Sequence, residues 1–179
     1  MSLEIVSQLD WQMVTEVVDQ EFGEGVTKTL RGRLMPVSKK SKKGISYYLV
    51  SSDWMRFLQN KFTDFEPAHL GRRFGDIVEG RFRFSLSMLD ELKDVTPNHL
   101  VVSGKGAEAF TYGRSILKES VVEVAPGLSR EQRVVVLNKH GDCLGLASLT
   151  VDSERIGRLG PDRLVAKNLA DIGWYIRNE

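Results

Sequence analysis

Apolar residues recur at helical intervals near the start of the chain. The apolar positions are Leu9, Met13, Val14, Val17 and Val18. Apolar side chains three or four residues apart form one face of an α-helix. Glycines follow at positions 23 and 25, and glycine readily adopts the left-handed conformation that ends a helix. The pattern therefore predicts an amphipathic helix from Leu9 to Phe22.

Alternating and β-branched runs predict a sheet in the rest of the first half. The expected strands are Thr27–Val37, Ile45–Ser51, Arg73–Val78 and Arg81–Leu86. In the last of these, Phe82 and Phe84 alternate with polar residues, so one face of the strand is apolar and the other meets water. A short helix capped by Ser52 or Asp53 is expected in WMRFLQN, and another in MLDELK.

The pattern changes at Pro97. Proline restricts the residue before it to extended conformations, so the preceding helix ends there. Five short β-rich runs then follow, namely HLVVSG, SVVEVA, RVVVLN, CLGLASLT and DRLVAKN. Short strands at this spacing predict a small barrel or sandwich. Helices are also expected at Gly106–Phe110 and Gly113–Lys118.

Composition narrows the class of protein. The 179 residues carry 25 Lys+Arg and 24 Asp+Glu, and 41% are hydrophobic. This is an ordinary globular composition and excludes a mostly disordered chain. No stretch approaches the ~20 apolar residues that cross a bilayer, and the N-terminus has no positive-then-apolar signal pattern. We therefore expect an intracellular, cytoplasmic protein without membrane contact, monomeric by default.

The near-zero net charge hides a segregation of charge along the chain. Residues 1–27 carry six acids and no base, whereas residues 28–43 carry seven bases and no acid. Such segregation indicates either a mobile solvated loop or a surface for a polar partner, and both alternatives stay open. The stretch Lys39–Gly44 is expected to be a basic hairpin loop.

Residues that could carry catalysis are sparse. The single cysteine, Cys143, can form no internal disulfide, and the three histidines have no metal-ligand spacing, so no metal and no cofactor are expected. The GKG after HLVVS lacks the rest of a dinucleotide or P-loop motif, and no GxSxG elbow marks a nucleophile. The sequence predicts no enzyme, with a catalytic Cys143 near His140 as the weaker alternative.

Basic residues in the second half form the best candidate site. Arg155 and Arg158 lie three apart, which is the spacing of one helix face. Arg163 and Lys167 lie four apart, and an even spacing places both on one face of a strand. Such a patch could neutralise phosphates of a nucleic acid. The alternative is a solvated face whose charges are balanced by neighbouring acids.

The stretch AFTYGRSILKES adds an aromatic component to this candidate site. Tyr112 and Gly113 precede two bases, Arg114 and Lys118. An aromatic ring beside glycine and bases could stack a nucleobase while the backbone approaches a phosphate. Alternatively, Phe110 is a core residue and Gly113 is a helix cap.

Several longer motifs resemble a known family. The runs AFTYGRSILKE, LGLASL and ADIGWYIRNE resemble a PUA domain, a compact pseudobarrel of RNA-modifying enzymes and ribosome-assembly factors. The runs YYLVSS and HLGRRFGDIVEGRFRFSLSMLDEL resemble the pre-PUA module that precedes it in one family. Together, from about Ile45 to Glu179, they are similar to the Nip-seven large-subunit ribosome biogenesis factors. The resemblance implies an α+β chain with an α/β pre-PUA domain of mainly antiparallel sheet (1–97) and a small β-pseudobarrel PUA domain (98–179).

This resemblance also implies a function. It implies a non-catalytic RNA-binding factor of large-subunit biogenesis and pre-rRNA processing, with pre-rRNA and ribosome-assembly or RNA-processing proteins as partners, and a nucleolar location if the source is eukaryotic. The expected RNA surface consists of Arg155, Arg158, Arg163 and Lys167, with Lys105, Arg114 and Lys118 as neighbours and Tyr112 and Gly113 beside them. RNA contact by Lys39–Lys43 is inferred from charge alone. The alternatives are an RNA-modifying enzyme or its accessory subunit, and a protein-interaction adaptor.

Overall fold

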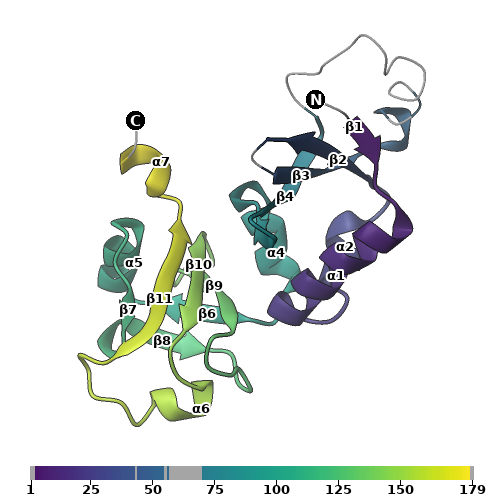
Figure 1. Cartoon of the computed structure of the whole chain (residues 1–179). Coiled ribbons are helices and arrows are strands. Elements are labelled where there is room, and N and C mark those ends of the chain that lie inside the picture. Colours follow the sequence, from purple (N-terminus) through teal and green to yellow (C-terminus); the bar gives the residue numbers. More distant parts are fainter. Residues whose placement is uncertain (1–2, 43, 55, 57–69, 178–179) are drawn as a thin grey trace. The chain divides into compact units, whose positions relative to one another are not determined.

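The computed structural model describes residues 3–42, 44–54, 56 and 70–177 (Figure 1). The chain divides into two compact units. The first unit consists of Met1–Gln20 and Glu24–Met88, and the second of Glu21–Gly23 and Leu89–Glu179. Each unit is described by itself.

The first unit is built on a five-stranded antiparallel sheet. Its strands lie in the order β1 (Leu3–Ile5), β2 (Met35–Ser41), β3 (Gly44–Val50), β4 (Arg72–Val78) and β5 (Arg81–Phe84). The helical elements are α1 (Gln8–Phe22), α2 (Val26–Arg31) and the short 3₁₀ helix η1 (Leu86–Met88). The predicted mainly antiparallel sheet is therefore confirmed.

Aromatic side chains join the sheet to helix α1. The ring of Trp11 on α1 lies 5.3 Å from that of Phe74, which in turn lies 5.4 Å from Phe84. Phe82 and Phe84 are buried while their neighbours Arg81 and Arg83 are exposed, as the alternation predicts. Ring pairs at these separations add to the stabilisation from burial. One face of the sheet is therefore packed against α1.

Helix α1 forms where predicted but buries a different face. Trp11, Val14 and Val18 are buried in the core, whereas Leu9, Met13 and Val17 are 71%, 52% and 38% exposed. The helix carries two apolar stripes, and the sheet covers the one with the larger aromatic surface. Because burial scales with apolar area removed from water, the stripe bearing tryptophan stabilises the packed state more.

The expected strand from Thr27 to Val37 is partly wrong, because its first residues form helix α2. The Asp19 carboxylate accepts hydrogen bonds from the backbone N–H groups of Gly25 and Thr27, at 3.0 and 2.8 Å. These bonds satisfy donors that the start of a helix leaves unpaired. Val26 and Leu30, four residues apart, are buried, so the segment packs as a helix.

The basic stretch forms the predicted hairpin, but with a tighter connection than a loop from Lys39 to Gly44. Ser41 pairs with Gly44, so Lys39 and Lys40 lie within strand β2. The Lys40 ammonium lies 2.7 Å from the Glu4 carboxylate of β1. That hydrogen bond and ion pair raise the pKa of Lys40.

The expected helix WMRFLQN, which starts at Trp54, begins two residues earlier than predicted. Residues 52–54 are helical, and the Trp54 N–H donates to the Ser51 hydroxyl at 3.5 Å, so Ser51 rather than Ser52 or Asp53 occupies the cap position. The rest of that helix, apart from position 56, lies outside the described residues.

The second unit is a strongly curved, barrel-like sheet, visible in the lower half of Figure 1. Its strands lie in the order β7 (Ile116–Leu117), β11 (Leu164–Asp171), β10 (Cys143–Leu149), β9 (Arg133–Leu137), β6 (His99–Val102) and β8 (Val121–Val124). Only β6 and β9 pair in parallel among the described strands. The helical elements are α4 (Leu89–Val95), α5 (Gly104–Thr111), the 3₁₀ helix η2 (Lys118–Ser120), α6 (Ser153–Ile156) and α7 (Trp174–Arg177). The predicted small β-barrel fold is confirmed.

The five strands predicted after Pro97 all form, and one helix does not. Helix α5 covers the predicted helix and places Phe110 in the core, only 1% exposed. The expected helix Gly113–Lys118 is wrong, because Ile116 and Leu117 form β7 and pair with β11. A short apolar run is compatible with a helix or a strand, and pairing with strand β11 makes this one a strand.

Within the second unit, the segment around Pro97 bonds to Glu21 and Phe22, which belong to this unit although they end helix α1. Asn98 donates its side-chain N–H to the backbone carbonyl of Glu21 at 2.9 Å, and Thr96 donates its hydroxyl to that of Phe22. The Glu21 carboxylate lies 3.0 Å from the guanidinium of Arg133. Burial raises the pKa of Glu21, and the charge of Arg133 opposes that shift. These bonds occupy carbonyls that a helix end leaves unpaired.

A substitution at Gly145 would test the close packing of strand β10 against strand β11. Its φ of +149° is rare for other residues, and a Cβ would overlap the carbonyl oxygen of Ala170. We expect Gly145→Ala to destabilise the second unit by about 3 kcal/mol, measured by urea unfolding. Gly157→Ala is the control, because open space surrounds Gly157 and its φ is helical. Equal stability of the two variants would contradict the packing described here.

Candidate nucleic-acid interface

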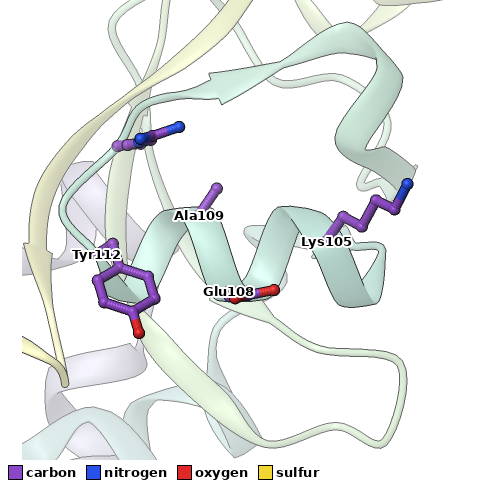
Figure 2. A pocket seen from close by; sticks show the side chains of 5 residues that line it. Lys105, Glu108, Ala109 and Tyr112 are labelled. Atoms are coloured by element: carbon purple, nitrogen blue, oxygen red, sulfur yellow. The ribbon is translucent and has the colours of Figure 1, made fainter.

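One face of helix α5 lines a hollow of about 600 Å³ on the second unit (Figure 2). Its lining residues are Lys105, Glu108, Ala109, Tyr112 and Arg114. The phenol ring of Tyr112 is 67% exposed. Lys105 and Tyr112 lie at opposite ends of α5, with Glu108 between them (Figure 2). The hollow therefore combines an exposed aromatic ring with two cations and one carboxylate.

The local sequence explains this arrangement. Ser103 caps α5, because its hydroxyl accepts the Gly106 N–H at 3.2 Å. The helix ends at Thr111, and Gly113, with a φ of +85°, turns the chain just after it while its N–H donates to the Phe110 carbonyl at 2.9 Å. The Arg114 N–H then donates to the Ala109 carbonyl at 3.0 Å. The chain thus turns back on the helix and brings Arg114 to the hollow. The predicted roles of Phe110 in the core and of Gly113 at the helix end are confirmed.

An ion pair between the buried carboxylate of Asp171 and the exposed Arg177 supports this turn. Asp171 is only 3% exposed, and its two oxygens each lie 3.0 Å from a different nitrogen of Arg177. Arg177 also donates to the carbonyl of Thr111. The hydrogen bond with Asp171 raises the pKa of Arg177, which therefore stays charged. Because the paired guanidinium is fixed in two directions, it holds the end of α5 in place.

Asn168 on β11 supports the same turn. Its side-chain N–H group lies 2.9 Å from the Phe110 carbonyl and 3.2 Å from the Asp171 carboxylate. Its backbone N–H donates to the Ser115 hydroxyl at 3.3 Å. The turn carrying Tyr112 and Arg114 is therefore bonded to strand β11 by side chains as well as by backbone pairing.

The structure brings Lys118 beside Arg163, although they are far apart in sequence. The Lys118 N–H donates to the Arg163 carbonyl at 2.9 Å, and the Glu119 N–H to that of Pro161. The start of α5 lies against the same segment, because the Ser103 N–H donates to the Ser120 carbonyl at 2.8 Å. Lys105, Lys118 and Arg163 are thus carried by three neighbouring segments.

The spacing argument for Arg163 and Lys167 fails in the structure. Strand β11 begins at Leu164, so Arg163 lies in the turn before it. The pairing with β7 shifts register between Leu164 and Ala166, and such a shift breaks the strict alternation of faces. Both side chains are nevertheless exposed, and Lys167 lies opposite Ser148 of β10.

Arg155 and Arg158 lie elsewhere on the barrel. Helix α6 ends at Ile156, so Arg158 lies in the following turn rather than on the predicted helix face. Figure 1 shows α6 at the end of the barrel and α5 along its side. Arg155 lies 3.7 Å from the Asp152 carboxylate. This segment carries mixed charge, as in the alternative of a balanced solvated face.

Glu154 contributes to that mixed charge. Its carboxylate accepts the Gly127 N–H at 2.7 Å. Hydrogen bonds from backbone N–H groups, its own and that of Gly127, lower the pKa of Glu154. The carboxylate beside Arg155 is therefore ionised at neutral pH.

The sequence reasoning missed Glu108 and Ala109 as lining residues. The spacing held part of the signal, because Lys105, Glu108 and Tyr112 are separated by three and four residues, but the predicted helix Gly106–Phe110 was too short to include Lys105 and Tyr112. Glu108 was overlooked because only bases and aromatic residues were considered as contacts for a polyanion.

Cys143, His99 and His140 are residues with potentially reactive side chains that the structure describes. Burial raises the pKa of Cys143 to about 11. The backbone N–H of His140 donates to the Asn138 side chain in the turn before it, and a ring nitrogen of His99 lies 2.8 Å from the Lys93 carbonyl. Within the described part of the chain, no cluster of three or more potential metal ligands occurs. No described helix is long and apolar enough to span a membrane, and His69 lies outside the described residues.

The Cys143 thiol gives a direct check on burial. Because its pKa is raised to about 11, almost no thiolate exists in the folded protein at pH 8, and the thiolate is the reactive form. We expect iodoacetamide to modify Cys143 far more slowly in the native protein at pH 8 than in urea, measured by mass spectrometry. Equal rates in the two conditions would contradict this environment.

Comparison with known proteins identifies the class of fold. Residues 98–179 match the family model described as UPF0113 PUA domain. A hypothetical protein of Pyrococcus horikoshii superposes with a TM-score of 0.66 at 12% identity, over 97% of this chain and 98% of that one. A PUA domain protein of Thermoplasma acidophilum superposes with a TM-score of 0.61 at 11% identity, over 96% and 95%. The fold is therefore that of PUA-domain proteins.

Sequence relatives carry a matching resemblance. A UPF0113 protein of Archaeoglobus fulgidus is 32% identical over 116 residues, covering 65% of this chain and 66% of that protein. The 60S ribosome subunit biogenesis protein nip7 of Schizosaccharomyces pombe is 29% identical over 111 residues, 62% of each chain. These alignments span just under two thirds of both relatives. Residues 98–179 thus match the UPF0113 PUA domain family, and the predicted resemblance to the Nip-seven proteins is confirmed.

Proposed function

We propose that this protein is a non-catalytic RNA-binding factor of large ribosomal subunit biogenesis that acts in pre-rRNA processing. The α5 hollow, lined by the exposed Tyr112 and by two cations, is the observation that carries this proposal. The names of the relatives support it, since one of them is a 60S ribosome subunit biogenesis protein. We assign RNA binding to a domain of residues 98–179, the range that the PUA family model matches.

The hollow suits an unpaired nucleotide. Stacking on an aromatic ring contributes about 1–3 kcal/mol per base and tolerates any base. Lys105 and Arg114 supply positive charge for the adjoining phosphates. Glu108 can accept a hydrogen bond from an exocyclic amino group, which would orient the base. Unpaired RNA is the expected ligand, because bases within a duplex are not available for stacking.

Further basic residues would extend the contact along the RNA. Lys118 and Arg163 lie on segments adjoining the start of α5, and Lys167 is exposed on β11. We assign phosphate contacts to these three first. Arg155 and Arg158 stay candidates at the end of the barrel, where neighbouring acids offset their charge.

The proposal of a non-catalytic role is supported by how the reactive residues are used. Cys143 is buried with a raised pKa, and the Ser103 hydroxyl caps α5. Such groups are engaged in folding rather than activated for attack. We propose a monomer that works in the cytoplasm, or in the nucleolus of a eukaryotic cell, with ribosome-assembly proteins as partners.

RNA binding can be tested with a labelled oligouridylate of roughly 16 nucleotides, the upper site size of one small single-strand-binding domain. We expect filter binding that weakens with salt. Arg163→Gln with Lys167→Gln should lower the slope of log affinity against log salt by about 1.4, since each single-strand phosphate contact contributes about 0.7. Tyr112→Ala should lower affinity about tenfold and leave that slope unchanged, because stacking is not ionic.

The matched control is Arg130→Gln with Lys139→Gln, which removes two exposed charges of the same unit outside the proposed surface. It should change the slope little. If the wild-type protein binds no RNA at low salt, the proposed function is wrong. If the control and the Arg163/Lys167 variant lower the slope equally, the assignment to this face is wrong.

The biological part of the proposal needs a cellular measurement. The full chain, used as bait in a lysate of its source cells, should enrich precursors of large-subunit rRNA over small-subunit rRNA, measured by reverse transcription. Tyr112→Ala should lose that enrichment, because the variant removes the stacking ring from the hollow. Equal recovery of the two rRNAs by the wild-type protein would contradict a role in large-subunit biogenesis.

A further inference from the structure

Basic residues of strand β2 and of strands β4 and β5 lie on one face of the sheet of the first unit. Directly opposed residues of neighbouring strands point to the same face. One such row runs across all five strands and consists of Leu3, Lys39, Ser46, Asp76 and Arg83. The next pair along β4 and β5 joins Val78 to Arg81, two residues from Arg83 and therefore on the same face.

This face is the one that helix α1 does not cover. Phe82 and Phe84 are buried on the α1 side, where Phe74 contacts the Trp11 ring. Arg81 and Arg83 alternate with these phenylalanines and are exposed, so their guanidinium groups lie on the opposite side of edge strand β5. Their backbone is held by the pairing of β5 with β4.

Positive charge dominates the exposed part of this face. Arg73, opposite Tyr48 on β3, is also exposed and lies 2.9 Å from the Asp76 carboxylate. Among the described strand residues, this face thus has four cations, at positions 39, 73, 81 and 83, and one carboxylate, Asp76, which Arg73 engages. The exposed Lys42 lies at the adjoining hairpin tip, next to β4, because Gly44 touches the backbone of Ile77.

We propose that this basic sheet face, comprising Lys39, Arg73, Arg81 and Arg83, is a second RNA-binding surface that holds the phosphate backbone of single-stranded RNA. Residues two apart on a strand are separated by about 7 Å, and neighbouring strands by about 4.8 Å. Cations at these intervals can engage successive phosphates of an extended strand. Guanidinium groups match phosphate geometry with two hydrogen bonds each.

The chemistry of the row favours RNA over an acidic protein. Protein interfaces depend on a buried apolar or aromatic anchor at their centre. Between Lys39 and Arg83 this row contains only Ser46 and Asp76, and the apolar side chains of the same face, Leu3 and Tyr48, are partly buried against Val37, Val50 and Leu70. A polyanion needs no such anchor, because release of its counterions drives binding. The inference goes beyond the proposed function, which places RNA on the PUA domain, and does not depend on it.

The test uses the full chain and two labelled oligouridylates, one of roughly 16 nucleotides and one twice as long. The variant is Arg81→Gln with Arg83→Gln. We expect weaker binding of the longer oligomer and a salt slope lower by about 1.4, from two lost phosphate contacts. Arg81→Lys with Arg83→Lys keeps both charges and should largely retain the slope, with weaker binding from the lost second hydrogen bonds.

The control is Lys28→Gln with Arg33→Gln, which removes two exposed charges of the same unit. These residues belong to α2 and the turn after it, on the side of α1, since Arg31 of α2 lies 5.9 Å from the Trp11 ring. Equal slopes for this control and for the Arg81/Arg83 variant would overturn the inference. A second outcome would also overturn it: polyglutamate binds this face of the wild-type protein, and the Arg81/Arg83 variant keeps the salt slope of the wild type for RNA. The face would then bind an acidic protein. If the Gln variant does not fold, the Lys39→Gln variant tests the same row.

The two proposals fail separately. Loss of binding in the PUA-face variants with no effect of the Arg81/Arg83 change would leave the proposed function standing and remove this inference. The reverse result would make the first unit the main RNA-binding surface. An absence of RNA binding by the wild-type chain would reject both.

Discussion

The buried carboxylate of Asp171 is the constraint on which the candidate RNA site depends. It pairs with Arg177 and lies within hydrogen-bonding distance of Asn168, and these two side chains bond the carbonyls of Thr111 and Phe110. The end of α5 is thereby fixed to β11 and to the C-terminal helix α7. An isolated helix of eight residues would not hold its last turn in water. Because this network does so, Tyr112 and Arg114 have defined positions at the hollow.

The tertiary structure, and not the net charge, determines where positive charge gathers on the surface of this protein. The formal net charge is only +1, yet each unit has an exposed face on which cations outnumber carboxylates. On the second unit, that face combines cations with a stacking ring. On the first unit, the sheet face bears cations, and its aromatic residue Tyr48 is packed against the buried cluster of Val37, Val50 and Leu70. The first arrangement is suited to an unpaired base and the second to a phosphate backbone.

Strands bounded by clear turn residues were predictable from local sequence. The alternation in RFRF and the turn at Glu79-Gly80 placed β5 correctly, and the runs after Pro97 placed five strands of the barrel. Two of the wrong element assignments share one cause. Val26–Arg31 and Ile116–Leu117 are short segments compatible with helix or strand. A partner outside each segment decides its structure: the Asp19 carboxylate for the first and strand β11 for the second.

The sequence by itself determined the two-part α+β organisation, the PUA-type second unit and the basic, aromatic character of its site, because these depend on local periodicity and on motifs of contiguous residues. Only the tertiary structure decided which residues share a surface. It separated Arg155 and Arg158 from the hollow and added Glu108. It also joined Lys39 to Arg83 across four strands. Strand register and the folding back of turns set these neighbours, and both arise from hydrogen bonds between residues far apart in the chain.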